Sequence, residues 1–333
     1  MAPGHLIVQS EALGNTRTVM DEVALNGVAA TREPLVPLAS AFRHTRDSNE
    51  GLSSVSVDRM TKSFRFAAQA TPSDGEQWLG TARRAEELGY STLLMPDGLQ
   101  LLSSMPALAL AAGATTTTLH VGNFVIASSL RAPRLTAWDA HTLSVLTGGR
   151  FELGIGAGLP QVAERGVELL GNAPTTAGQR LALAEQTIDE LRALDGGRRT
   201  PVLMAAGGRK SRAVAAAKAD IVVLSAGPLA SRDEYRALAD EVRALAADRA
   251  ADLEFVSPVF VVGDEAPPWA LQFMGTDMGT LIARDSLRIL RGTPRQMADE
   301  LLRRRDDLGI SYSSVNAAFL QDFAPVIELL DGR

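Results

Sequence analysis

The stretch Gly148-Gly149-Arg150-Phe151-Glu152-Leu153-Gly154-Ile155-Gly156-Ala157-Gly158 contains a turn followed by a strand with two very different faces. Side chains alternate along a strand, so each face receives every second residue. The apolar face carries Phe151, Leu153, Ile155 and Ala157, and the nearly bare face carries Glu152, Gly154, Gly156 and Gly158. Glycine inside a strand indicates that another backbone or a ligand comes very close. The pattern supports two interpretations equally: a flat ring lies on the bare face, or a neighbouring strand packs against it.

Outward from this strand, apolar runs of strand length alternate with helical patterns. Besides the glycine strand, the predicted strands cover residues 65–70, 91–97, 119–127, 201–206, 220–225, 254–262 and 311–317. The predicted helices cover residues 74–88, 106–116, 133–146, 179–194, 209–219, 233–248, 267–308 with an interruption near Gly292-Thr293-Pro294, and 324–330. Eight strand–helix pairs in sequence predict an α/β protein folded as a closed (β/α)8 barrel, or TIM barrel.

The first part of the chain lacks this alternation of strand and helix patterns. Residues 1–62 show scattered apolar residues and a polar stretch, Asp47-Ser48-Asn49-Glu50-Gly51. We therefore expect an irregular N-terminal extension, disordered or loosely packed, followed by a barrel domain over residues 63–333. Met60 is a candidate for the true start of the folded unit.

Composition excludes several classes of function. The chain has 46% hydrophobic and 22% charged residues among 333, an ordinary globular balance, and it lacks cysteine, which excludes disulfides and thiolate sites. A net charge of -6 without a basic patch argues against a nucleic-acid partner. The longest run of small apolar residues, 105–114, is too short to cross a membrane, and the N-terminus lacks a secretory signal pattern. We therefore expect a cytoplasmic protein.

In a (β/α)8 barrel the catalytic surface is the rim at the C-terminal ends of the strands. Most residues predicted there are small or neutral, which leaves room for a large ligand and offers few acids or bases. They are Gln69, Asp97, Ala127, Ser128, Ser129, Gly156, Ala157, Gly158, Ala206, Gly207, Gly208, Arg209, Ser225, Ala226 and Asn316. Asp97 is the exception, and its carboxylate is equally compatible with ligand contact and with capping a helix.

The clearest binding element is Ala205-Ala206-Gly207-Gly208-Arg209-Lys210-Ser211, where the fifth strand passes into a helix. Paired glycines let the backbone curl, and the N-terminus of a helix attracts an anion through its N–H groups and dipole. We favour a phosphate-binding turn; the alternative is an ordinary connection with solvated basic side chains.

Other catalytic patterns are missing from the sequence. The four histidines, His5, His44, His120 and His141, have no zinc-binding spacing, and no G-x-S-x-G motif occurs. No metal site is expected. Arg65 and Glu152 both begin strands, and as a pair they would close the bottom of the barrel in a stabilising role. With so few acids and bases, a bound cofactor would have to supply the reactive atom.

Several segments together resemble the luciferase-like flavin and deazaflavin oxidoreductases. They are T-L-S-V-L-T-G-G-R-F-E-L-G-I-G-A-G at residues 142–158, Arg83-Arg84-Ala85-Glu86-Glu87-Leu88-Gly89-Tyr90, Pro96-Asp97, Gly292-Thr293-Pro294 and Phe323-Ala324-Pro325-Val326. The resemblance runs from about residue 64 to residue 330, and the closing segment looks most like the branch that uses the deazaflavin coenzyme F420.

The resemblance implies a cofactor lying across the strand ends. Its phosphate would be held by Ala206, Gly207, Gly208 and Arg209, and its ring would be lined by Gly156, Ala157 and Gly158. The other implied cofactor-binding residues are Gln69, Asp97, Ala127, Ser128 and Ser225, and Asp97 is the one candidate catalytic residue. Many relatives also have a non-proline cis peptide at the end of the third strand, which would fall at Ala127-Ser128. A homodimer is implied as well.

This sequence differs from the family pattern at two places that bear on the proton donor and on the pocket. Gly98 stands where many relatives have a histidine, and only residues 195–200 separate the helix at 179–194 from the fifth strand, where relatives carry a longer insertion. The expected function is an F420-dependent oxidoreductase whose reduced coenzyme delivers hydride to a C=C or C=N bond of a small metabolite. The alternatives are an FMN-dependent luciferase-like monooxygenase and a non-catalytic luciferase-like subunit that binds cofactor or supports a partner.

Overall fold

The computed structural model describes residues 62–115 and 118–333. The predicted N-terminal extension, including Met60, lies outside the described residues except for Lys62, so the proposed domain boundary stays a prediction. No helix among the described residues combines the length and apolar character needed to span a membrane.

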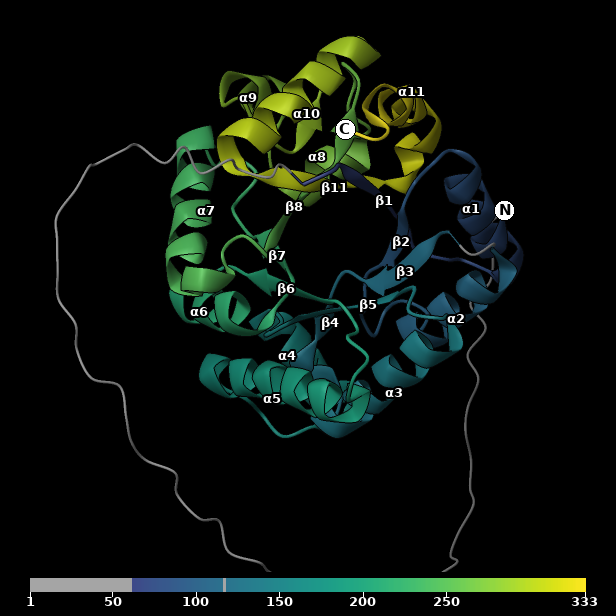
Figure 1. The fold of residues 1–333 in the computed structure, drawn as a ribbon, viewed down its shortest axis with the longest axis vertical. Helices are drawn as coiled ribbons and strands as arrows, with labels where there is room; N and C mark the ends of the chain where they lie inside the picture. Colours follow the sequence, from purple (N-terminus) through teal and green to yellow (C-terminus); the bar gives the residue numbers. More distant parts are fainter. Residues whose placement is uncertain (1–61, 116–117) are drawn as a thin grey trace, which may run out of the picture. The chain divides into compact units, whose positions relative to one another are not determined.

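Eight parallel strands of the described chain close into a barrel, which confirms the predicted fold class (Figure 1). They are β1 (Arg65–Gln69), β2 (Thr92–Met95), β3 (His120–Asn123), β5 (Phe151–Gly156), β6 (Val202–Ala206), β7 (Ile221–Leu224), β8 (Glu254–Val259) and β11 (Ile310–Asn316). Each strand pairs with the next in this order, and the ring closes where Ala67 of β1 pairs with Ser314 of β11. A short strand, β4 (Ile126–Ala127), continues beside β5 after β3 ends.

Helices surround the barrel on its outside (Figure 1). They are α1 (Gly75–Glu87), α2 (Ser104–Ala114), α3 (Pro133–Leu146), α5 (Ala177–Asp195), α6 (Arg209–Lys218), α7 (Arg232–Ala246), α10 (Pro294–Leu308) and α11 (Leu320–Leu330). Local sequence explains where several begin. The Asp74 carboxylate accepts a hydrogen bond from the Gln77 N–H at the start of α1, and Thr293 and Gln296 cap α10 reciprocally.

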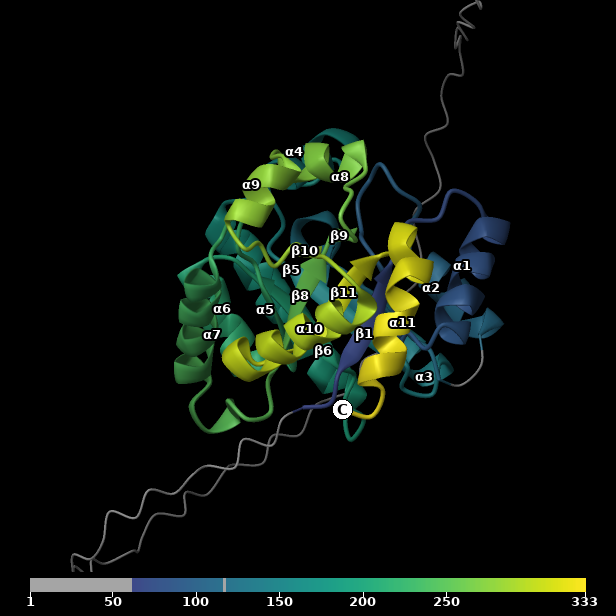
Figure 2. The ribbon, with the colours of Figure 1, turned by 90° about the horizontal axis from the view of Figure 1, so that it is seen from above.

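The additional elements gather at one end of the barrel (Figure 2). These are α4 (Pro160–Leu170) after β5, and α8 (Pro268–Met274) and α9 (Met278–Ala283) after the short strand β9 (Val261–Val262). The sequence analysis missed α4, which begins at Pro160, ends before Gly171 in the left-handed region and buries only Ala163 and Gly166.

The single helical region predicted over residues 267–308 is wrong in its first half. Gly275 ends α8 in the left-handed region, at φ 64°, and Asp277 starts α9 by capping the Thr280 N–H. The chain then forms β10 (Ile289–Leu290), which pairs with β9. The predicted strand 254–262 is accordingly two strands, β8 and β9, separated at Phe260.

The interior of the barrel is filled by apolar side chains rather than left open. Seven buried residues form this inner cluster: Ala67, Leu94, Leu203, Ile221, Val223, Val256 and Tyr312. Phe124, Val125 and Ala205 are partly buried and pack against it. A larger cluster fills the space between the outside of the strands and the helices. The barrel is therefore a packed core, and ligands have access only to its ends.

A charged cluster closes the N-terminal end of the barrel. Arg65 forms ion pairs with Glu152 and, at 2.8 Å, with Glu254, and its guanidinium lies 4.3 Å from the centre of the Tyr312 ring. The predicted pairing of Arg65 with Glu152 is confirmed. Burial opposes the charged form of Arg65, but the two carboxylates outweigh it and raise the arginine pKa. Burial also raises the pKa of Glu254, although Arg65 counteracts it.

Candidate functional site

The turn between β6 and α6 has the form expected of an anion-binding site. Gly208 is the N-cap residue of α6, with extended backbone at φ -101° and ψ 160°. The Ser211 hydroxyl accepts from the Gly208 N–H at 3.0 Å and donates to the Gly208 carbonyl at 2.8 Å, and Arg212 donates to the Gly207 carbonyl at 2.7 Å. These contacts fix the curl of the backbone. The first N–H groups of a helix lack intrahelical partners and carry the positive end of its dipole.

Space beside this turn is open. A Cβ atom added at Gly207 would meet only Ser225, at 3.7 Å, and one added at Gly208 would meet only the Ser211 hydroxyl, at 3.8 Å. Gly207, Gly208 and Arg209 are exposed. The structure thus places Gly207 and Gly208 beside Ser225, at the ends of β6 and β7, and Arg209 follows them as the first residue of α6. Ala206, the last residue of β6, is buried beneath them.

The bare face of the glycine strand is occupied by the chain itself. A Cβ atom at Gly154 would lie 1.7 Å from the Asn123 carbonyl oxygen, and one at Gly156 would lie 3.3 Å from Val125. At Gly158, where φ is +72°, it would lie 2.9 Å from Ala127. Packing against a neighbouring segment is therefore the correct interpretation at Gly154, where nothing larger than hydrogen fits. The implied role of Gly156, Ala157 and Gly158 in lining a cofactor ring stays a prediction.

A cis peptide bond joins Phe124 to Val125, not Ala127 to Ser128 as the resemblance implied. The prediction was wrong because β3 ends at Asn123, and the Phe124 N–H bonds to the Met95 carbonyl at 2.8 Å. The apolar run that looked like one strand is two strands, and Ala127 instead leads into a single 3₁₀ turn, Ser128–Leu130.

Asp97 lies within an internal polar network. One carboxylate oxygen accepts from Ser104 and from Arg131, both at 2.7 Å, and Asn123 donates to the Ser104 hydroxyl at 2.9 Å. The carboxylate is 3% exposed, and its second oxygen is buried without a hydrogen-bond partner among the described residues. This arrangement ties the ends of β2 and β3 to α2. A catalytic role for Asp97 stays a prediction, and the geometry gives it a positioning function. No motif in the sequence marks Arg131, because its partner lies 34 residues away.

The remaining predicted rim residues divide into two groups. Gln69 and Asn316 pair across β1 and β11 and line a cleft of about 350 Å³ together with Pro96. Ala127 and Ser128 are buried, and the Ser128 hydroxyl donates to the Arg180 carbonyl at 2.6 Å. Gln69 is therefore accessible to a ligand, whereas Ser128 has a structural partner. A role for any of them in holding a cofactor stays a prediction.

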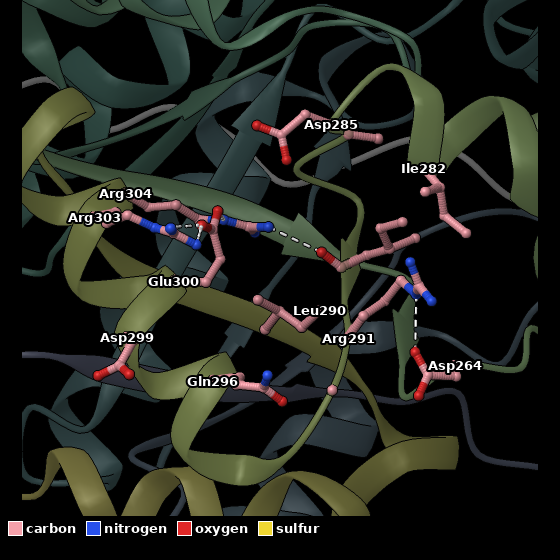
Figure 3. Close-up of a pocket in the computed structure, with 13 residues that line it drawn as sticks. Asp264, Ile282, Asp285, Leu290, Arg291, Gln296, Asp299, Glu300, Arg303 and Arg304 are labelled. Carbon is pink, nitrogen blue, oxygen red and sulfur yellow. Dashed lines mark hydrogen bonds and ion pairs between the residues drawn. The ribbon is translucent and has the colours of Figure 1, made fainter.

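A cleft of about 550 Å³ lies elsewhere, between α9, β10 and α10 (Figure 3). Its walls are strongly charged, and several of these charges are paired within the protein. Arg291 binds Asp264 at 2.9 Å, and Glu300 binds Arg303 and Arg304 at 2.7 and 2.8 Å. The described residues contain no cluster of three or more His, Asp or Glu side chains arranged to hold a metal ion.

Comparison with known proteins agrees with this geometry. Residues 59–198 match the family model of the luciferase-like monooxygenases. Comparison with curated protein sequences gave no match. Among solved structures, the fold is similar to an F420-dependent secondary alcohol dehydrogenase in complex with an F420-acetone adduct (TM-score 0.63, 14% identity), covering 81% of this chain and 98% of that one.

Two further structures illustrate the range of cofactors among similar folds. The coenzyme F420-dependent tetrahydromethanopterin reductase from Methanopyrus kandleri has a TM-score of 0.58 and 17% identity, covering 81% of this chain and 98% of that one. The oxygenating constituent of 3,6-diketocamphane monooxygenase from Pseudomonas putida, in complex with FMN, has a TM-score of 0.59 and 14% identity, covering 80% of this chain and 95% of that one.

The protein is thus a closed (β/α)8 barrel with an open glycine turn at the C-terminal end of β6. The family match confirms the resemblance to the luciferase-like oxidoreductases over residues 59–198, and the similar solved structures share the barrel fold.

Proposed function

We propose that this protein is an F420-dependent oxidoreductase in which the reduced coenzyme delivers hydride to a C=C or C=N bond of a small metabolite. The observation that carries the proposal is the open turn at Gly207 and Gly208, next to Ser225, on the rim where barrel enzymes bind their ligands. The coenzyme, when bound, would supply the hydride, because the chain itself offers few acids or bases at the rim.

The chain's own residues would hold and orient the coenzyme. Gly207, Gly208 and Arg209 would hold its phosphate: Gly207 and Arg209 through backbone N–H groups and the guanidinium, and Gly208, whose N–H binds Ser211, by leaving space for it. Phe124, Val125 and Ala205, which cover the inner cluster of the barrel, would present an apolar surface to the rest of the ligand. The Asp97–Arg131 ion pair would keep the ends of β2 and β3 in place beside it.

The same turn suits FMN, which also carries a phosphate, and an FMN-dependent monooxygenase is therefore the second candidate. The F420 proposal is supported by the sequence resemblance of the closing segment and by F420-dependent proteins among the similar folds. The third candidate function is that of a non-catalytic luciferase-like subunit that binds cofactor or supports a partner. The cytoplasmic location expected from the sequence belongs to this proposal too.

Titration of the purified protein with each oxidised cofactor separates these functions. We expect F420 to bind with a dissociation constant in the low micromolar range or below, about -8 kcal/mol, and more tightly than FMN. Absorbance and fluorescence changes of the cofactor report the binding. Preferred binding of FMN, together with oxygen consumption in the presence of reduced FMN, would instead identify the monooxygenase. Binding of neither would favour the non-catalytic subunit.

We also propose that two copies associate through α2 and α3, which lie next to each other on the outside of the barrel (Figure 1). α2 contains no charged residue, and α3 exposes Leu135, Trp138, Val145 and Leu146, with Trp138 61% exposed. An exposed apolar face of this kind marks an interaction surface. Because α2 is uncharged, it can meet its own copy across a twofold axis without burying a charge, which favours a homodimer.

Replacement of Trp138 by glutamate is expected to convert the dimer into a monomer, since a twofold interface would then bury two carboxylates. Sedimentation velocity measures the change. Trp269→Glu is the matched control, because Trp269 is also exposed but lies on α8. A wild-type protein that sediments as a monomer, or a Trp138→Glu variant that stays dimeric, would rule out this interface.

A further inference from the structure

The segment at residues 286–288 holds the loop that follows β7. The Ser286 hydroxyl donates to the Pro228 carbonyl at 2.6 Å, and Arg288 donates to the Ala226 carbonyl, also at 2.6 Å. Ala226 directly follows Ser225, which is the residue that lies against Gly207. Ser286 and Arg288 therefore fix the loop after β7, which contacts the glycine turn through Ser225.

Arg288 is a buried charge. Its side chain is enclosed by the rings of Tyr235 and Phe260, each with its centre 5.8 Å from the guanidinium, and the residue is 6% exposed. It donates to the carbonyls of Ala226 and Pro258, but none of the described aspartates or glutamates forms an ion pair with it. Burial accordingly lowers the pKa of its guanidinium. An uncompensated buried charge destabilises a protein unless another group balances it.

Two arginines close to Arg288 in the chain have a carboxylate partner, whereas Arg180, which is also 6% exposed, binds a carbonyl and forms no ion pair with a described residue. Arg291 pairs with Asp264, and Arg304, which is 2% exposed, pairs with Glu300 (Figure 3). Arg249 also binds only carbonyl groups, but these belong to the C-terminal end of α6, where the helix dipole is negative. Arg288 instead binds the carbonyl of Ala226, which follows β7, and the carbonyl of Pro258, which lies in β8. The strands of a sheet have only small net dipoles. The chain thus leaves the charge of Arg288 without a counter-charge of its own.

We infer that Arg288 is a positioning residue for the anion bound at Gly207 and Gly208: it fixes the loop after β7 against the turn and places a positive charge behind it. The link to the turn runs through the Ala226 carbonyl, which Arg288 binds, and the adjacent Ser225, which lies beside Gly207; the positive charge of Arg288 would favour an anion there. The identity of that anion as a cofactor phosphate rests on the proposed function. The role of Arg288 requires only that a phosphate group binds at the turn.

The inference is tested with inorganic phosphate as the probe, through titration calorimetry at constant ionic strength and through melting temperatures with and without phosphate. Arg288→Met is expected to weaken phosphate binding by about tenfold or more, because it removes both the charge and the loop contact. Arg288→Lys keeps the charge and is expected to stay within about threefold of the wild type. Arg150→Met is the matched control: Arg150 also binds only carbonyl groups, but at the N-terminal end of β5, so its loss should lower the melting temperature and leave phosphate affinity unchanged.

The inference fails if Arg288→Met retains the wild-type phosphate affinity, or if Arg150→Met loses as much affinity as Arg288→Met. Should Arg288→Met not fold, Arg288→Gln decides: a loss of about tenfold in phosphate affinity supports the inference, and wild-type affinity overturns it. The proposed function fails separately. If wild-type protein binds phosphate in an Arg288-dependent way but binds neither F420 nor FMN, only the proposed function is lost. If F420 binds equally well to the wild type and to Arg288→Met, only this inference is lost.

Discussion

Gly208→Asp is expected to abolish cofactor binding while leaving the protein at least as stable as the wild type. Gly208 has the extended backbone of an N-cap residue, and a Cβ atom there meets nothing closer than 3.8 Å, so aspartate fits. Aspartate is a preferred N-cap residue, and its carboxylate interacts favourably with the helix dipole, so stability should change by only a few tenths of a kcal/mol in the favourable direction.

The same carboxylate repels a phosphate at the turn. Two unit charges about 4 Å apart interact by roughly 4 kcal/mol at the effective dielectric of a protein surface, which corresponds to a loss of affinity of at least about 100-fold. Cofactor titration measures the affinity, and urea unfolding measures the stability. The cofactor affinity should fall while the free energy of unfolding rises slightly. A variant that failed to fold would lose both.

Gly208→Asn is the matched control, because asparagine caps the helix equally well and carries no charge. We expect it to retain most of the cofactor affinity, with a reduction of no more than about tenfold since its side chain competes for the same N–H groups. If aspartate and asparagine have equal effects, the bound group at the turn is not an anion. If neither variant changes the affinity, the cofactor phosphate lies elsewhere on the rim.

The barrel and the glycine turn could be predicted because both are encoded locally. Each strand and its following helix show their own periodicity, and helix boundaries carry local signals such as Asp74 before α1. The pair Gly207 and Gly208, directly before a helix, indicates an anion site from five or six residues alone. These features need no knowledge of what lies across the barrel.

The parts of the site that the sequence missed depend on contacts between distant segments. The residues from Gly122 to Ala127 look like one apolar strand, and only the missing side chain of Gly154 allows the Asn123 carbonyl to turn in and break it. Arg131 and Arg288 lie outside any motif, and their partners are 34 and 62 residues away. Strand β10 is two residues long, too short for periodicity to reveal.

At the opposite end of the barrel, Arg65→Met is expected to cost about 3–5 kcal/mol of stability, because it leaves two carboxylates buried without a counter-charge. The side chains of Glu152 and Glu254 are 2% and 9% exposed, and both bind Arg65. Urea unfolding measures the loss. Arg291→Met is the matched control: it breaks the pair with Asp264, whose side chains are 39% and 62% exposed, and an exposed pair contributes less than about 1 kcal/mol.

The loss should depend on pH in a defined direction. Burial already holds the pKa of Glu254 above its ordinary value, and Arg65 is one of the groups that lower it, so removing Arg65 raises this pKa further. A group whose pKa is raised on folding stabilises the folded state below its ordinary pKa, and this contribution disappears as pH rises through the raised value. The variant should therefore lose less stability at about pH 5 than at about pH 8, because protonation relieves the unpaired carboxylates at the lower pH. A loss that is equal at both values would mean that the aliphatic part of Arg65 and its contact with Tyr312, rather than its charge, hold this end of the barrel closed.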